Sequence, residues 1–210
     1  MKKKKITIVD YGAGNILSLR RALEYLSLNV EIVSDSRSIH NADYLILPGD
    51  GAFGYAIKKL KSKKIYESII NHISQHKPFM GICIGMQLLF TESNEFGKHK
   101  GFNIIQGKIT KIQKTKNIKI PSIGWSEILI NNNHNKLGSI NLKEFNKKNF
   151  YFVHSFKAEV KNNKDLIGYY FHGKNKISAI VGKENVIGTQ FHPEKSGKDG
   201  LKLIEKFIKI

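Results

Sequence analysis

The stretch from Lys77 to Phe90 constrains the fold of this chain more than any other part of the sequence. Its segment Phe79–Ile82 is a short apolar run introduced by Pro78, which is typical of a buried parallel strand. Its last part, Met86–Phe90, is apolar and free of helix breakers, so we expect a helix to start there. A sharp strand-to-helix turn must then lie between the two segments.

The turn has the sequence Gly81-Ile82-Cys83-Ile84-Gly85, with a glycine two residues before and two residues after a cysteine. Side chains at both positions would collide in so sharp a turn, which is a steric reason for glycine. The turn would present the sulfur at the N-terminus of the following helix, where the macrodipole favours a thiolate. A buried structural cysteine is the competing interpretation. Because Cys83 is the only cysteine and a candidate base follows downstream, we predict a nucleophile.

The candidate base lies in the segment Gly188–Gly197, which contains His192-Pro193-Glu194. A nucleophilic thiol needs an imidazole to take its proton, and the imidazole needs a carboxylate to fix its tautomer and orientation. We predict that His192 is the base and that Glu194 orients it. Pro193 stiffens the segment and keeps it from continuing as a helix.

Strands and helices alternate in the first half of the sequence, and this pattern predicts a parallel sheet whose active site lies at the carboxyl ends of its strands. The expected strands are Ile6–Val9, Asn29–Val33, Tyr44–Leu47 and Phe79–Ile82; the expected helices carry Ile16 to Leu26, Ala56 to Leu60 and Ile65 to Ser74.

From Ile104 onward the pattern changes to short β-branched runs, which predict a mixed or antiparallel extension of the same sheet. These runs are Lys108–Ile112, Ile118–Ile123, Ser126–Ile130, Phe150–Ser155, Ile177–Val181 and Val186–Gln190, with a closing amphipathic helix from Gly200 to Ile208. The predicted fold is thus α/β, a single domain over residues 1–210. Its central sheet is mostly parallel and flanked by helices.

Composition limits the class of protein. A chain of 210 residues that is 40% hydrophobic fits one α/β domain, and a single cysteine excludes a disulfide scaffold and suits a reducing compartment. Met1–Lys5 is basic, but the apolar run behind it is too short for a signal peptide, and no later stretch is apolar enough to span a membrane. We expect a soluble cytoplasmic protein without membrane contact.

The formal net charge of +18 invites a nucleic-acid interpretation, which we reject. The basic residues are nearly all lysines spread along the chain, whereas bidentate phosphate and base recognition favours arginine. Gly12-Ala13-Gly14 starts like a dinucleotide fingerprint, but Leu17 stands where the third glycine would fall. We expect no nucleic-acid partner, no cofactor and no metal.

With its cysteine turn and its His-Pro-Glu segment, the sequence resembles the class I (triad-type) glutamine amidotransferases over nearly its full length. The resemblance is greatest to the glutaminase subunits of imidazole glycerol phosphate synthase. The further blocks that carry it are Val9–Asn15, Leu47–Gly54, Gly124-Trp125, Tyr151–Ser155 and Gly188–Gly197.

The resemblance implies an enzyme that hydrolyses L-glutamine to glutamate and ammonia through Cys83, His192 and Glu194. It also implies further roles by matched position. The matched residues are Gly49, Asp50, Gly51 and Ile84 around the oxyanion; Gln87, His154, Ser155 and Phe156 around glutamine; and Asn15, Trp125, Tyr151 and Lys195 at a partner interface.

The implied partner is a (βα)₈-barrel synthase subunit that receives the ammonia in a heterodimer. That complex makes imidazole glycerol phosphate and AICAR in histidine biosynthesis. Three positions depart from the family pattern: Asp50 replaces an apolar residue, Ser122 a histidine and Ser126 an asparagine. The alternative is a paralogous subunit that supplies ammonia for the amidination of a surface-polysaccharide sugar.

A carboxylate that points into the oxyanion turn would repel the developing negative charge. We therefore expect the side chain of Asp50 to point away, toward the partner face or a nearby lysine. Two competing functions remain: a non-catalytic binding module, which needs no Cys-His-Glu set, and a cysteine peptidase, which needs neither Gln87 nor the His-Pro-Glu segment.

Overall fold

The first half of the chain alternates strands and helices as predicted, in a computed structural model that describes residues 5–116, 118–138 and 140–209. Residues 1–4 of the basic N-terminal segment lie outside the described part. The elements are β1 (Lys5–Val9), α1 (Ile16–Tyr25), β2 (Asn29–Val33), α2 (Ser36–His40), β3 (Tyr44–Leu47), α3 (Phe53–Ser62), α4 (Tyr66–Ser74) and β4 (Phe79–Ile82).

The second half consists mainly of strands. They are β5 (Phe90–Ser93), β6 (His99–Lys100), β7 (Ile105–Lys111), β8 (Ser122–Ile130), β9 (Lys136–Leu137), β10 (Ile140–Asn141), β11 (Lys148–His154), β12 (Phe156–Val160), β13 (Leu166–His172), β14 (Asn175–Lys183) and β15 (Val186–Thr189). The helical elements are α5 (Ile84–Gln87), η1 (Lys143–Phe145), η2 (Asn163–Asp165), η3 (Pro193–Lys195) and α6 (Gly197–Phe207).

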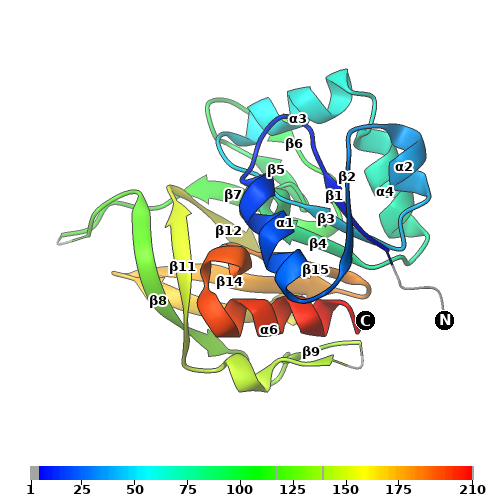
Figure 1. Cartoon of the computed structure of the whole chain (residues 1–210). Helices are drawn as coiled ribbons and strands as arrows, with labels where there is room; N and C mark the ends of the chain where they lie inside the picture. The colour runs from blue at the N-terminus through cyan, green and yellow to red at the C-terminus, as the bar shows by residue number, and fades with distance from the viewer. Residues whose placement is uncertain (1–4, 117, 139, 210) are drawn as a thin grey trace.

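Within the described residues, nine strands form one sheet in the order β11-β8-β13-β14-β15-β4-β3-β1-β2 (Figure 1). The neighbours from β15 to β2 pair in parallel, whereas those from β11 to β15 pair antiparallel. The predicted α/β class, with a parallel sheet and an antiparallel extension, is therefore confirmed.

Part of the predicted extension belongs to a different sheet. The strands β12, β7, β5 and β6 form a separate four-stranded sheet in that order. The prediction of two strands at Ile118–Ile123 and Ser126–Ile130 was wrong, because one strand, β8, runs through Gly124. Its residues pair with β11 in continuous register from Ser122 to Ile128.

Two apolar cores lie on the two faces of the large sheet. One packs α1 and α6 against the strands, through side chains such as Leu19 and Leu203. The other packs α3 and α4, through side chains such as Leu60 and Ile69. In Figure 1, α1 and α6 lie together on one side of the sheet, and α3 and α4 lie beyond its other side.

The predicted helix over Met86–Phe90 is not formed. The helix α5 ends at Gln87, and Phe90 begins β5. In a longer helix the Leu88 carbonyl would accept an N–H of the same helix. Here it accepts the N–H of Phe102, in the segment between β6 and β7, at 2.7 Å. The expected macrodipole at the cysteine is therefore that of a single turn. None of the described helices is long and apolar enough to cross a membrane.

Candidate active site

The Cys83 turn joins β4 to α5 with a backbone conformation that L-residues rarely adopt. Cys83 has φ of 53° and ψ of −108°, and its N–H donates to Thr189 O of β15 at 2.7 Å. A Cβ atom on Gly81 would lie 2.5 Å from the Gly85 carbonyl oxygen. The flanking glycines are thus sterically required, and the neighbouring strand holds the strained turn in place.

The structure brings the predicted triad residues together at the carboxyl ends of β4 and β15. His192 presents Nε2 to the Cys83 sulfur, and these two atoms lie within 4.8 Å of each other. On the other side of the ring, Nδ1 lies 2.9 Å from Glu194 Oε1, and both side chains are 3% exposed. This is the order thiol, imidazole, carboxylate that nucleophilic catalysis requires.

The charge of the imidazole is set by its neighbours. Burial by itself disfavours the imidazolium, but the neighbouring Cys83 sulfur and the hydrogen-bonded Glu194 carboxylate outweigh it and raise the pKa of His192 well above its usual value. A protonated imidazole next to the sulfur stabilises the thiolate. The site therefore holds a proton donor next to the Cys83 sulfur.

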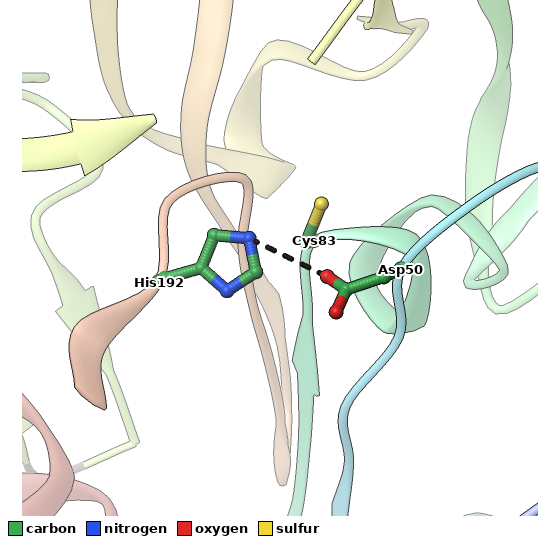
Figure 2. Close-up of side chains that lie close together, drawn as sticks. All are labelled: Asp50, Cys83 and His192. Carbon is green, nitrogen blue, oxygen red and sulfur yellow. Dashed lines mark ion pairs between the residues drawn. The ribbon is translucent and has the colours of Figure 1, made fainter. Parts of the chain in front are cut away.

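The expectation that Asp50 points away was wrong. Its Oδ1 lies 3.8 Å from His192 Nε2, and its side chain is 47% exposed. Figure 2 shows the Asp50 carboxylate turned toward the His192 ring, with the Cys83 sulfur beside both. Attraction to the imidazolium explains this orientation, and the partial exposure keeps the cost of desolvating the carboxylate small.

A cavity of about 390 Å³ opens over the cysteine, and all four predicted glutamine-binding residues line it. Its lining includes Gln87, His154, Ser155 and Phe156 from that prediction, together with Cys83 and Ile84 of the turn, Asp50, Gly51 and Lys195. Within it, the Gln87 amide nitrogen donates to Phe156 O at 3.5 Å and to Gln190 Oε1 at 3.0 Å. The cavity has room for a small polar molecule.

The residues around the predicted oxyanion site contact one another. The N–H of Ile84 donates to Gly49 O at 3.4 Å. This donor would have to exchange the carbonyl for a substrate oxygen. Gly51 adopts φ of +89° in an open region, so the turn has a flexible hinge next to Asp50.

Sequence reasoning missed three polar residues at this site. Gln190 is fully buried, and its amide donates to Cys83 Sγ at 3.7 Å. Glu95 lines the cavity with a carboxylate whose Oε2 accepts the Phe53 N–H at 2.6 Å. The Tyr11 hydroxyl is buried against Gly49. Only Gln190, two residues before His192, carried a local signal.

The four predicted interface residues lie at the same end of the molecule as the triad. Trp125 of β8 is 57% exposed and meets Tyr151 of β11 edge-on, with ring centroids 6.1 Å apart. Lys195 lies in η3 at the cavity. Asn15 caps α1 by accepting the Ser18 N–H, and α1 packs against η3.

Comparison with known proteins identifies the family. The model of the family described as "Glutamine amidotransferase class-I" matches residues 7–210. The chain belongs to this family. Solved structures share the fold: one titled "Crystal structure of glutamine amidotransferase" matches with a TM-score of 0.73 at 13% identity over 97% of both chains. "Structure of PurLQS from Thermotoga maritima" matches with a TM-score of 0.73 at 21% identity, over 99% of this chain and 98% of that one.

Curated relatives are more similar in sequence than the solved structures. The "Imidazole glycerol phosphate synthase subunit HisH 1" of Legionella pneumophila (strain Paris) is 40% identical over 98% of this amidotransferase chain and 99% of its own. The subunit HisH of Caldanaerobacter subterraneus subsp. tengcongensis is 42% identical over 96% of both chains. These relatives agree with the resemblance seen in the sequence.

Proposed function

We propose that this chain is the glutaminase subunit of an imidazole glycerol phosphate synthase. The observation that carries the proposal is the meeting of a strained Cys83, which lines the cavity, with the buried imidazole-carboxylate pair of His192 and Glu194. The names of the curated relatives support the choice of complex. The barrel-shaped cyclase partner and a cytoplasmic location are parts of the same proposal.

In the first half of the reaction, the Cys83 thiolate attacks the carboxamide carbon of glutamine and forms a C–S bond. As the tetrahedral intermediate collapses, the C–N bond breaks and His192 gives its proton to the leaving nitrogen, which departs as ammonia. In the second half, His192 takes a proton from water, whose oxygen attacks the thioester. The C–S bond then breaks, and glutamate leaves.

Both intermediates carry an oxyanion that needs hydrogen-bond donors. We assign the Ile84 N–H and, after rotation of the Gly49–Asp50 peptide, the Asp50 N–H. That rotation moves the Gly49 carbonyl away from the Ile84 N–H, to which it is bonded in the structure. Loss of one such donor typically costs about 10²- to 10³-fold in rate.

The free end of glutamine needs a partner for each of its charges. We assign the α-ammonium to Glu95, a carboxylate at the cavity, and the remaining contacts to Gln87 and the backbone of His154–Phe156. These roles place the side-chain amide of the substrate over Cys83. Ammonia would then leave toward the end of the sheet that carries Trp125 and Lys195, where we place the partner.

A second function has an observation in its favour. Asp50, Ser122 and Ser126 depart from the pattern of the histidine-pathway subunits, and Ser122 bonds to Tyr170 Oη at 3.0 Å. A paralogue that supplies ammonia for amidination of a surface sugar would have a different partner face. Its glutaminase chemistry would be the same.

The deciding experiment measures glutamate release by the purified chain with and without the cyclase subunit encoded in the same genome. We expect slow hydrolysis alone, a large increase with the partner and its ligand, and none for Cys83→Ser, because a hydroxyl is a far poorer nucleophile. Hydrolysis by folded Cys83→Ser at the wild-type rate would exclude the mechanism. Full activity without any partner would exclude the subunit role.

A further inference from the structure

We propose that Asp50, Cys83 and His192 form a binding site for a divalent transition metal of the zinc type, and that a bound ion blocks the thiol. These residues come from three separate segments: the turn after β3, the turn after β4 and the segment before η3. Figure 2 shows the three side chains close together, with the ion pair between His192 and Asp50 dashed and the Cys83 sulfur beside it.

The distances suit a single ion. One ligand atom from each residue lies within 4.8 Å of the other two, and Nε2 of His192 is 3.8 Å from Oδ1 of Asp50. Zinc bonds of ~2.3 Å to sulfur and ~2.0–2.2 Å to nitrogen and oxygen, in a tetrahedron, separate ligand atoms by roughly 3.3–3.7 Å. No pair of ligand atoms therefore needs to approach by more than about 1.5 Å. The half-exposed Asp50 side chain can move to shorten its own distances to the sulfur and to Nε2.

The orientation of the imidazole is a second, independent observation. Its Nε2 is buried, faces the cluster and has no hydrogen-bond partner among the residues that the structure describes. Its Nδ1 is held by the Glu194 carboxylate at 2.9 Å. A carboxylate on the far ring nitrogen is the arrangement that orients histidine ligands in zinc sites. His192 thus offers a fixed nitrogen ligand without a hydrogen-bond partner in the described part of the chain, and a bound metal ion would take the place of the proton on Nε2.

The chemistry of the three ligands selects the class of metal. A thiolate and an imidazole favour zinc, cobalt and cadmium over magnesium and calcium, which prefer oxygen ligands alone. Three protein ligands leave a fourth position open to the cavity, where water completes the tetrahedron. With an apolar residue in place of Asp50, only Cys83 and His192 would remain as ligands. The Asp50 carboxylate therefore supplies the third ligand of the proposed metal site.

Occupancy would have a direct consequence for the enzyme. A metal bound to the Cys83 sulfur and the His192 nitrogen removes the nucleophile and the base together. The ion would therefore act as a reversible inhibitor that competes with glutamine. A chelator would restore activity.

The test uses the full chain, reduced and stripped of metal, titrated with Co²⁺ in the absence of glutamine. Binding at the proposed site gives a thiolate-to-cobalt charge-transfer absorption, and competition with Zn²⁺ then gives the zinc affinity. Asp50→Asn keeps the shape of the side chain but is a poorer ligand, and Asp50→Val removes it. Asp43→Asn is the matched control, because it removes an exposed carboxylate before β3, away from the cluster.

We expect zinc to bind at least about 10-fold more weakly to both Asp50 variants and equally well to Asp43→Asn. Loss of the Glu194 support in Glu194→Gln should weaken binding by about 10- to 100-fold. Cys83→Ser should lose the charge-transfer band. Equal affinity in the wild type and Asp50→Asn, or cobalt binding without that band, would overturn the proposal. Because these readouts need no turnover, they stand apart from the glutaminase assay.

Discussion

The backbone carbonyl of Tyr151 accepts a hydrogen bond from the backbone N–H of His192, with an N–O distance of 3.0 Å. The hydroxyl of Ser196 closes the loop, since it accepts the Tyr151 N–H at 3.0 Å and donates to His192 O at 2.6 Å. The ring of the same Tyr151 packs against the exposed Trp125. The edge strand that we assign to the partner interface thus holds His192, the base that we propose, directly.

This loop predicts that Ser196→Ala impairs both stability and hydrolysis. The change leaves the part-buried Tyr151 N–H without its partner and leaves the His192 carbonyl with only the Lys195 N–H, which costs about 1–3 kcal/mol of unfolding free energy. It also loosens His192, and we expect glutaminase kcat to fall by about 10-fold, equivalent to about 1.4 kcal/mol. Thermal unfolding and steady-state kinetics measure the two effects. Ser62→Ala, whose hydroxyl bonds to an exposed helix end, is the control. Unchanged kcat would show that the loop does not position the base.

Glu95 gives a prediction about pH. Burial raises the pKa of its carboxyl, and the Phe53 N–H and His99 only partly oppose this. Because the protonated carboxyl of Glu95 cannot bind an ammonium group, kcat/KM for glutamine should fall with decreasing pH. The midpoint of this fall should lie at a higher pH than the pKa of an ordinary glutamate. This profile reports the free enzyme.

Glu95→Gln should raise KM for glutamine by at least about 10-fold, the order expected for a charged hydrogen bond. The acidic fall that the glutamate causes should also disappear. The amide oxygen can still accept the Phe53 N–H, so the loop remains in place. A variant that keeps the wild-type KM and pH profile would place the α-ammonium elsewhere.

The parallel half of the fold was predictable because its signals are local. The bounds of Asn29–Val33, Tyr44–Leu47 and Phe79–Ile82 match the structure, since apolar runs ended by turn residues determine such strands. The strand β5, with the sequence FTES, has only its first and last residues buried and lacks both a continuous apolar run and a clear alternation. Pairing with β6 and β7 makes it a strand, and no local pattern records that pairing.

The site residues also divide into those that a local motif predicts and those that only the folded chain brings to the site. Cys83, His192 and Glu194 were predictable because each lies in a compact motif whose chemistry needs that order of groups. Glu95 was missed because its carboxylate is held by the N–H of Phe53, which is far away in the sequence. The orientation of Asp50 depends on His192 in another strand connection. A repulsion argument within one turn could not include that attraction.

Trp125 provides a test of the partner surface. Its ring is 57% exposed on β8, so removal costs the isolated fold little. If the ring anchors the cyclase, Trp125→Ala should weaken association by at least about 30-fold, as for an interfacial hot spot of about 2 kcal/mol. Basal hydrolysis should stay near the wild-type rate. Titration calorimetry measures the association. Tyr25→Ala, which removes an exposed ring at the end of α1, should bind normally. Equal binding by Trp125→Ala would move the interface elsewhere.

The last prediction concerns the charge of Asp50. During attack, negative charge moves from the Cys83 sulfur to the substrate oxygen, which we place against the Gly49–Asp50 turn. Two unit charges about 4 Å apart interact by about 4 kcal/mol at an effective dielectric constant of 20 and by about 1 kcal/mol in water. Because the Asp50 side chain is 47% exposed, the lower figure applies. Its carboxylate should therefore slow the basal reaction by roughly 5-fold.

Asp50→Asn removes this charge at constant shape, and Asp50→Val also removes the polar group. We expect both variants to hydrolyse glutamine faster than the wild type when alone, with KM nearly unchanged. If the docked partner turns the wild-type carboxylate away from the oxyanion, the stimulated rates will be similar, and the ratio of stimulated to basal activity will fall. A higher basal rate in Asp50→Val alone would show that the shape of the side chain, and not its charge, slows the basal reaction. Unchanged ratios in both variants would show that the carboxylate does not oppose the oxyanion, despite its contact with His192.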